Sequence, residues 1–197
     1  LPANILPLAV NSIAQVGLES ILSAGAYGAE QIIYLCSPLK QDDKTIIEKQ
    51  GIYAKAIFDG LGYDADRFFV VDDDDPEIIS KFLWNNTSKP EMPNSDFMPK
   101  GRKRSIMSLA LNSLHKNAPK PVDVIELPVG APFGNIELNS KGCTLCLSCV
   151  GSCPTGALKA NNDKPQLSFS EMACVQSGLC KNTCPESVIT LSPRISF

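Results

Sequence analysis

The spacing of the cysteines is the feature that most constrains what this chain can fold into. Seven of the eight cysteines lie between positions 143 and 184. Residues 143–154 have the pattern C-x2-C-x2-C-x3-C-P, and residues 174–185 repeat it 31 positions later at three cysteines and at the proline. Because two-residue gaps let three sulfur atoms converge from one short loop, we expect this segment to fold around its sulfurs.

The two runs differ at one position. The first run supplies four cysteines, but in the second run Ser177 stands where the repeat places a cysteine. This spacing is typical of loops whose thiolates bind a cubane iron–sulfur cluster, and in two-cluster proteins the fourth cysteine of a run binds the other cluster. The candidate ligands are Cys143, Cys146, Cys149 and Cys153 in the first run and Cys174, Cys180 and Cys184 in the second.

Zinc and disulfide bonds are the alternative uses of such cysteines. A structural zinc site takes four ligands, whereas this array offers seven cysteines and a Cys-Pro at the end of each run. Disulfides need an oxidising compartment and usually an even number of cysteines, and nothing in the sequence signals export. We therefore favour iron over both.

Residues 139–193 resemble the bacterial two-cluster ferredoxin domain through these two runs. The resemblance implies a small α+β domain with two clusters, whose ligands are exchanged between the runs. It implies that a [4Fe-4S] cluster is bound by Cys143, Cys146, Cys149 and Cys184. It implies that the second cluster is bound by Cys153, Cys174 and Cys180, with Ser177 at the fourth corner.

Ser177 leaves the type of the second cluster open. A serine hydroxyl must lose a proton of very high pKa to bind iron, and its oxygen is a harder and poorer ligand than a thiolate. Three outcomes remain: a [3Fe-4S] cluster, a [4Fe-4S] cluster with a non-cysteine or labile corner, or no second cluster. A serine introduced deliberately in place of cysteine would give the same sequence.

Length and composition favour two domains and a redox partner. The chain has 197 residues, 44% of them apolar, which allows one substantial core and a smaller domain. The cysteine-rich segment is poor in large apolar residues, so its metal centres should act as its core. The net charge of −3 argues against nucleic acid or an anionic membrane as the main partner and suits a basic surface on a redox protein.

We expect a cytoplasmic protein without membrane insertion, because no apolar run approaches about eighteen residues and no leader is recognisable. The chain opens on Leu1 and is almost at once within an apolar segment. We therefore expect a piece of something larger, whose further domains could be its partners.

The first two thirds of the chain alternate between strand and helix patterns. We predict strands at residues 4–10, 31–37, 67–71 and 122–127. Helices are predicted after a capping box at Ser12 and at residues 44–61, 78–84 and 106–114, with a loop at 85–100. This succession favours an α/β fold with a parallel-rich sheet flanked by helices. The predicted division is an α/β domain at 1–127, a connecting arm at 128–138 and a two-cluster ferredoxin domain at 139–197.

Two further resemblances point to redox function. Residues 28–36 and 53–69 resemble the α/β domain of the delta subunit of methyl-viologen-reducing hydrogenases. That resemblance implies an electron-relay context, although only Cys36 is present where that family has several cluster cysteines. Residues 128–197 are similar to the C-terminal part of larger multi-cluster iron–sulfur proteins of proteobacteria, in which the counterpart of Ser177 is ordinarily cysteine.

Other candidate residues have simpler explanations. Cys36, at the expected ligand-binding end of a strand, is interpreted as a small buried hydrophobe. The acidic residues 72–75 are interpreted as a solvated face with a helix cap, and the basic residues at 100–104 as an exposed cluster. His115 is interpreted as a surface residue near a helix end. The glycines follow helices rather than strands, so a phosphate-binding loop is not supported. They are Gly25, Gly28, Gly60 and Gly62.

Electron transfer is the function that these patterns favour, with the ferredoxin-type domain passing single electrons within a larger redox assembly. On this hypothesis the chain is not an enzyme by itself. One alternative is a redox enzyme subunit that binds a substrate or nucleotide near Asn11 and Cys36. Another is an iron–sulfur sensor of oxygen or iron that uses the corner at Ser177.

Overall fold

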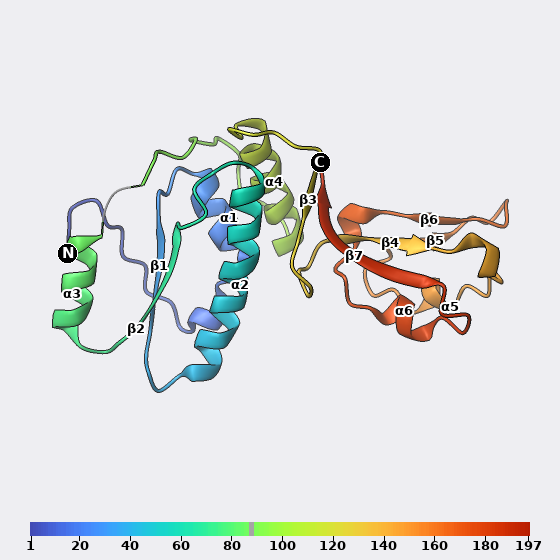
Figure 1. Cartoon of the computed structure of the whole chain (residues 1–197), viewed down its shortest axis with the longest axis horizontal. Helices are drawn as coiled ribbons and strands as arrows, with labels where there is room; N and C mark the ends of the chain where they lie inside the picture. The colour runs from blue at the N-terminus through green and yellow to red at the C-terminus, as the bar shows by residue number, and fades with distance from the viewer. Residues whose placement is uncertain (87–88) are drawn as a thin grey trace. The chain divides into compact units, whose positions relative to one another are not determined.

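The computed structural model describes residues 1–86 and 89–197. The chain divides into two compact units, Leu1–Val122 and Asp123–Phe197, and each is considered by itself (Figure 1). Thr87 and Ser88, which belong to the loop predicted at 85–100, lie outside the described residues. The division falls a few residues before the predicted boundary at 127, so the fourth predicted strand belongs to the second unit.

The first unit contains a strand–helix–strand motif. Strand β1 (Ile32–Cys36) is followed by helix α2 (Gln41–Gly60) and strand β2 (Phe68–Asp72). The two strands pair in parallel, with Cys36 opposite Asp72. Helix α3 (Pro76–Asn85) then begins at the Asp75 cap, whose side chain accepts a hydrogen bond of 2.8 Å from the backbone N–H of Glu77. These four elements confirm the predicted spans.

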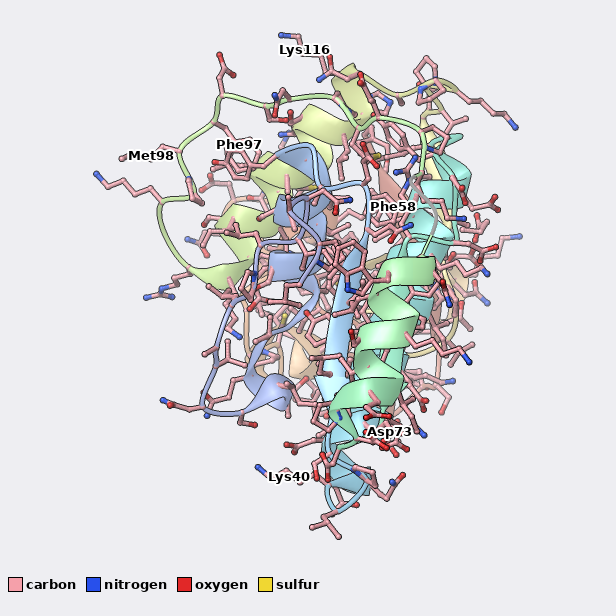
Figure 2. All side chains as sticks on the ribbon, turned by 90° about the vertical axis from the view of Figure 1, so that its left-hand side faces the viewer. Lys40, Phe58, Asp73, Phe97, Met98 and Lys116 are labelled. Atoms are coloured by element: carbon pink, nitrogen blue, oxygen red, sulfur yellow. The ribbon has the colours of Figure 1, made fainter. Side chains whose placement is uncertain are left out.

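Helices supply most of the core of the first unit. Helix α1 (Leu18–Ala26) packs against α2 and against α4 (Lys103–Lys116), and Phe58 of α2 lies in the interior (Figure 2). Arg67, only 2% exposed, donates a hydrogen bond of 2.9 Å from Nη1 to the carbonyl oxygen of Glu30. The fully buried apolar residues include Ile21, Leu22, Ile47, Ile57, Phe58, Leu111 and Leu114.

The prediction of a strand at residues 4–10 is wrong. The segment has no strand structure, and its apolar side chains Leu6 and Leu8 are 91% and 81% exposed. Pro7 in its centre has no N–H to donate, which disfavours pairing within a sheet. The capping box at Ser12 is also wrong, because a short 3-10 helix η1 (Ile13–Gln15) follows it without a side-chain cap and α1 begins only at Leu18.

The expectation of an α/β fold is therefore confirmed in a coarser form. Among the described residues, the only parallel pair is β1 with β2, and the remaining sheets are antiparallel. The chain is a mixed helix and strand protein with a small parallel sheet rather than one with a parallel-rich sheet. In the described residues, no helix combines the length and the apolar character that crossing a membrane would require.

The second unit consists of short strands joined by cysteine-containing loops. Strand β7 (Ile189–Ser196) is the centre of a three-stranded antiparallel sheet, between β3 (Val124–Glu126) and β4 (Gly134–Leu138). Strands β5 (Leu158–Ala160) and β6 (Leu167–Phe169) form an antiparallel pair. The strand predicted at 122–127 is thus present as β3, and it pairs with β7.

Candidate metal centres

The repeat in the sequence is also a repeat in the backbone of the second unit. Short 3-10 helices, η2 (Ser140–Gly142) and η3 (Glu171–Ala173), precede the two runs. Short helices, α5 (Ser148–Gly151) and α6 (Leu179–Thr183), follow their second cysteine positions. The strands that pair on either side also correspond, since Leu138 lies opposite Ile189 and Leu158 opposite Phe169.

The loops themselves have the same conformation. Positive φ angles occur at three equivalent positions, two within each run and one just after it. Such angles are uncommon for residues with side chains, so a shared set shows that both loops follow the same path. Ser177 therefore changes one side chain without changing the shape of its loop. The pairs are Leu145 (55°) with Gln176 (53°), Leu147 (62°) with Gly178 (76°), and Gly156 (64°) with Ser187 (52°).

Each predicted ligand set lines one cavity. The first cavity, about 320 Å³ and partly open to solvent, is lined by four cysteines together with leucine, isoleucine and valine side chains. Three of these cysteines come from the first run and the fourth from the second run. The cysteines of the first cavity are Cys143, Cys146, Cys149 and Cys184.

The second cavity is the counterpart of the first. It measures about 330 Å³ with its solvent-open part included, and it is lined by Cys153 of the first run with Cys174 and Cys180 of the second. Ser177 lines it as well, so all eight predicted site residues lie at one cavity or the other. Cys153 of the first run thus lines the cavity with cysteines of the second run, and Cys184 of the second run lines the cavity with cysteines of the first.

The two cavities adjoin one apolar cluster. Its buried members are Cys149, Leu158 and Ile189, of which Cys149 lines the first cavity and Leu158 the second. Three further cysteines are partly buried and pack against this cluster: Cys153, Cys180 and Cys184. Residues of both cavities thus share one small core.

The environments of the cysteines differ. Burial raises the pKa of Cys149 and of Cys180. The exposed Cys146 donates from Sγ to Ser148 Oγ at 3.4 Å, and hydrogen bonding with the Ser148 side chain lowers the pKa of Cys146. At Cys153 burial acts to raise the pKa, but hydrogen bonds led by the backbone N–H of Leu158 outweigh it and lower the pKa.

One residue of the second cavity was missed by sequence reasoning. The side-chain amide of Gln176 donates from Nε2 to Cys174 Sγ at 3.5 Å and to the carbonyl oxygen of Asn135 at 2.9 Å. Its equivalent in the first run is Leu145, which has no polar atom in its side chain. Comparing the two runs position by position would have shown this difference, because the flanking cysteines align.

The chemistry of these donors suits iron–sulfur clusters. Clusters of four irons are held by cysteine thiolates, which the two cavities supply as four and as three plus a serine. Within residues 1–86 and 89–197, no group of three or more His, Cys, Asp or Glu side chains is placed to hold a single metal ion. A cluster binds its cysteines through separate iron atoms, so its ligands need to surround a volume rather than meet at one point.

The remaining candidate residues lie in the first unit, where they contribute to packing and to salt bridges. Cys36 is 2% exposed, and burial followed by the charge of Asp72 raises its pKa. Asp72 itself accepts a 2.7 Å salt bridge from Lys44 at the end of the parallel pair, where Lys40 and Asp73 also lie (Figure 2). Two further contacts are Lys103 with Glu19 at 2.7 Å and His115 Nε2 with the Val122 carbonyl oxygen at 3.0 Å.

Asn11 and Gly25, at exposed or turn positions of the first unit, take part in surface and packing. Asn11 is exposed and follows the irregular N-terminal segment rather than a strand. Gly25 packs against Phe58, because a Cβ at that position would lie 2.8 Å from the ring. These residues contribute to packing and surface, so the part of the chain that brings reactive side chains together is the second unit.

No protein-family model matches the chain, and a search of curated proteins finds no match either.

Proposed function

We propose that the second unit is a ferredoxin-type module that transfers single electrons, with one iron–sulfur cluster in each cavity. The observation that supports this most strongly is the exchange of ligands, since Cys153 and Cys184 each line the cavity formed mainly by the other run. An exchange of this kind is the ligation pattern of two-cluster ferredoxins. A single zinc site would not call for two such cavities.

The ligand sets follow from the lining residues. Cys143, Cys146, Cys149 and Cys184 would hold a [4Fe-4S] cluster in the first cavity. The second set would hold either a [3Fe-4S] cluster or a [4Fe-4S] cluster with a non-cysteine corner. That set is Cys153, Cys174 and Cys180, with Ser177 at the corner.

Such clusters supply reversible one-electron oxidation and reduction, and the protein sets their potentials through charge, hydrogen bonds and burial. The residues of this chain contribute all three. Cys149 and Cys174 are buried, with 7% and 8% of their surface exposed. Ser148 and Gln176 form hydrogen bonds to cysteine sulfurs. Cysteines that line each cavity pack on one apolar cluster, Cys149 and Cys184 from the first cavity and Cys153 and Cys180 from the second, so the two sites share one small core through which an electron could pass.

The first unit is proposed to dock this module in a larger redox assembly, as the resemblance to the hydrogenase delta subunit suggests. A basic surface on a redox protein would complement the net charge of −3. We also place the protein in the cytoplasm, where thiols stay reduced before iron is inserted. On this proposal the chain relays electrons and does not itself convert a substrate.

The test is an anaerobic redox titration of the iron-reconstituted chain, followed by EPR spectroscopy. The proposal predicts at least one reversible one-electron signal with the spectrum of an iron–sulfur cluster. A matched variant, Cys149→Ala, should lose the signal of the first cavity and keep that of the second. Reconstituted protein that shows no reversible iron–sulfur signal would refute the proposal.

A further inference from the structure

The side chain of Gln176 lies against the sulfur of Cys174 in a position that the fold holds open for it. Both its backbone N–H and its Nε2 donate to Cys174 Sγ at 3.5 Å. The other hydrogen of Nε2 is used in the 2.9 Å bond to the carbonyl oxygen of Asn135 on β4. One amide nitrogen therefore links a cluster ligand to the central sheet.

The absence of a side chain at Gly134 makes room for this amide. A Cβ at Gly134 would lie 2.5 Å from Gln176 Nε2 and 2.5 Å from the carbonyl oxygen of Ser192. Contacts that short do not occur between a real Cβ and its neighbours, so β4 has to carry glycine where Gln176 approaches. The glycine accommodates both the Ser192 carbonyl oxygen and the amide of Gln176, which can therefore approach β4 closely.

The orientation of the amide is fixed by its neighbours. If the amide were turned over, Oε1 would face the carbonyl oxygen of Asn135 and the sulfur of Cys174, both of which are acceptors. In the observed orientation Oε1 is buried and has no hydrogen-bond partner within the described residues. Leaving that oxygen unpaired has a cost, which the two N–H donations offset.

The first cavity lacks this device. The equivalent of Gln176 is Leu145, which lines the first cavity with an apolar side chain. The first cavity does have the Ser148 hydroxyl near Cys146, but Cys146 is exposed and water already solvates it. Cys174 is 8% exposed, so a donated hydrogen bond there acts in a less polar environment and has a larger effect.

The charges of the lining residues also favour a higher reduction potential at the second cavity. Four cysteines line the first cavity and three the second, where Ser177 takes the fourth place. Glu186 also lines the first cavity, whereas the equivalent residue at the second cavity is Thr155, whose Oγ1 lies 3.7 Å from Cys153 Sγ. The Glu186 carboxylate therefore opposes negative charge added on reduction at the first cavity and has no charged counterpart in Thr155 at the second.

We propose that Gln176 is a positioning residue that raises the reduction potential at the second cavity. An electron delivered to this module would therefore be held at the second cavity rather than at the first. The inference rests on the proposed electron-transfer function and adds a direction to it. Transfer of one electron between the sites would oxidise the cluster in the first cavity and reduce the cluster in the second. No bond would form or break, and no proton would move. The electron is supplied from outside by a low-potential one-electron donor.

The test measures both potentials by EPR-monitored titration in four proteins: the unaltered chain, Gln176→Met, Gln176→Glu and Gln166→Met. Signals are assigned with Cys143→Ala, which affects the first cavity, and Cys174→Ala, which affects the second. Methionine keeps the length of Gln176 but has no N–H to donate. Gln166 is exposed and lines neither cavity, so Gln166→Met makes the same chemical change where it should have no effect.

We expect the second potential to lie above the first in the unaltered chain. Gln176→Met should lower the equilibrium constant for reduction at the second cavity about threefold to tenfold. For one electron this corresponds to a reduction potential lower by about 30 to 60 mV. The first potential should not change, and Gln166→Met should change neither. Gln176→Glu should lower the second potential further, because a carboxylate replaces the donor.

Several results would overturn the inference. They are a second potential below the first in the unaltered chain, equal shifts at both cavities, or no shift in either Gln176 variant. If Gln176→Met loses iron from the second cavity, the potential is measured in Gln176→Glu instead. Loss of that iron in both variants would show that Gln176 has a purely structural role. A chain with only the first cluster would overturn this inference while leaving the relay function standing, whereas a chain without any cluster refutes both.

Discussion

Replacing Ile189 by alanine should greatly weaken the iron-free second unit. Ile189 is 2% exposed and forms the buried apolar cluster of that unit with Cys149 and Leu158. Partly buried apolar side chains pack around these three residues, among them Ile136, Leu138, Leu167 and Phe169. Without metal, this cluster is a main source of apolar burial around the cysteine loops, and Ile189 is its largest fully aliphatic member together with Leu158.

The expected loss is a large part of the stability available. Truncating a buried isoleucine to alanine costs about 2 to 5 kcal/mol. The unit Asp123–Phe197 has 75 residues, for which a folding free energy of about 4 to 11 kcal/mol is ordinary. The variant should therefore remove between a fifth and all of it, and small domains that depend on metal lie at the lower end of that range.

Amide hydrogen exchange followed by mass spectrometry is the suitable assay. The only tryptophan, Trp84, and all four tyrosines lie in the first unit, so their fluorescence does not report on the second. In iron-free protein, peptides from residues 123–197 of Ile189→Ala should exchange at least about thirtyfold faster than in the unaltered chain, since about 1.4 kcal/mol is a factor of ten.

The matched control is Ile57→Ala. Ile57 is fully buried in α2 of the first unit, so this change should speed exchange in peptides from residues 1–122. Unchanged protection of 123–197 in Ile189→Ala would refute the reasoning that this apolar cluster holds the iron-free unit together.

Three further predictions concern single side chains. Cys184→Ala should abolish the signal assigned to the first cavity although Cys184 belongs to the second run, and loss of only the second signal would contradict the exchanged ligand sets. Burial raises the pKa of Tyr34 from 10.0 to about 12, so its protonated form stabilises the first unit fully below about pH 10 and less as pH rises toward 12. Urea melts followed by Trp84 fluorescence should show this loss and show less of it in Tyr34→Phe; an unchanged alkaline profile in that variant would refute it. A hydrogen bond from Lys44 lowers the pKa of Asp72, so the stability from that pair is present above the ordinary carboxyl pKa of about 3.9 and is lost as pH falls through the lower folded value. Lys44→Met should therefore have a lower melting temperature than the unaltered chain at neutral pH and the same melting temperature in strong acid. A difference in melting temperature that stays constant across pH would contradict this.

Short-range patterns in the sequence predicted the elements that depend on short-range physics. The span of α2 followed from apolar residues recurring at helical spacing, and α3 from Asp75 placed before a proline at its first position. The 31-residue repeat of the cysteine runs was visible in the sequence, and the structure adds that the two loops share a set of positive φ angles.

Predictions failed where the outcome depended on partners distant in the sequence. Residues 4–10 have strand-like composition, but Pro7 removes a ladder donor and no neighbouring strand pairs with them in the described residues. Strand β3 was predicted from its alternation, yet alternation does not say that its partner is β7. Gln176 escaped notice because its role depends on Gly134 and Asn135, which precede it by some forty residues.

Iron and acid-labile sulfide, counted per chain in anaerobically prepared protein, test the central claim that the two cavities hold iron–sulfur clusters. We predict about seven or eight irons with a similar number of sulfides, for one [4Fe-4S] cluster and a second cluster of three or four irons. Four irons would limit the account to the first cavity. Protein that binds zinc in place of iron, or that contains no inorganic sulfide, would contradict it.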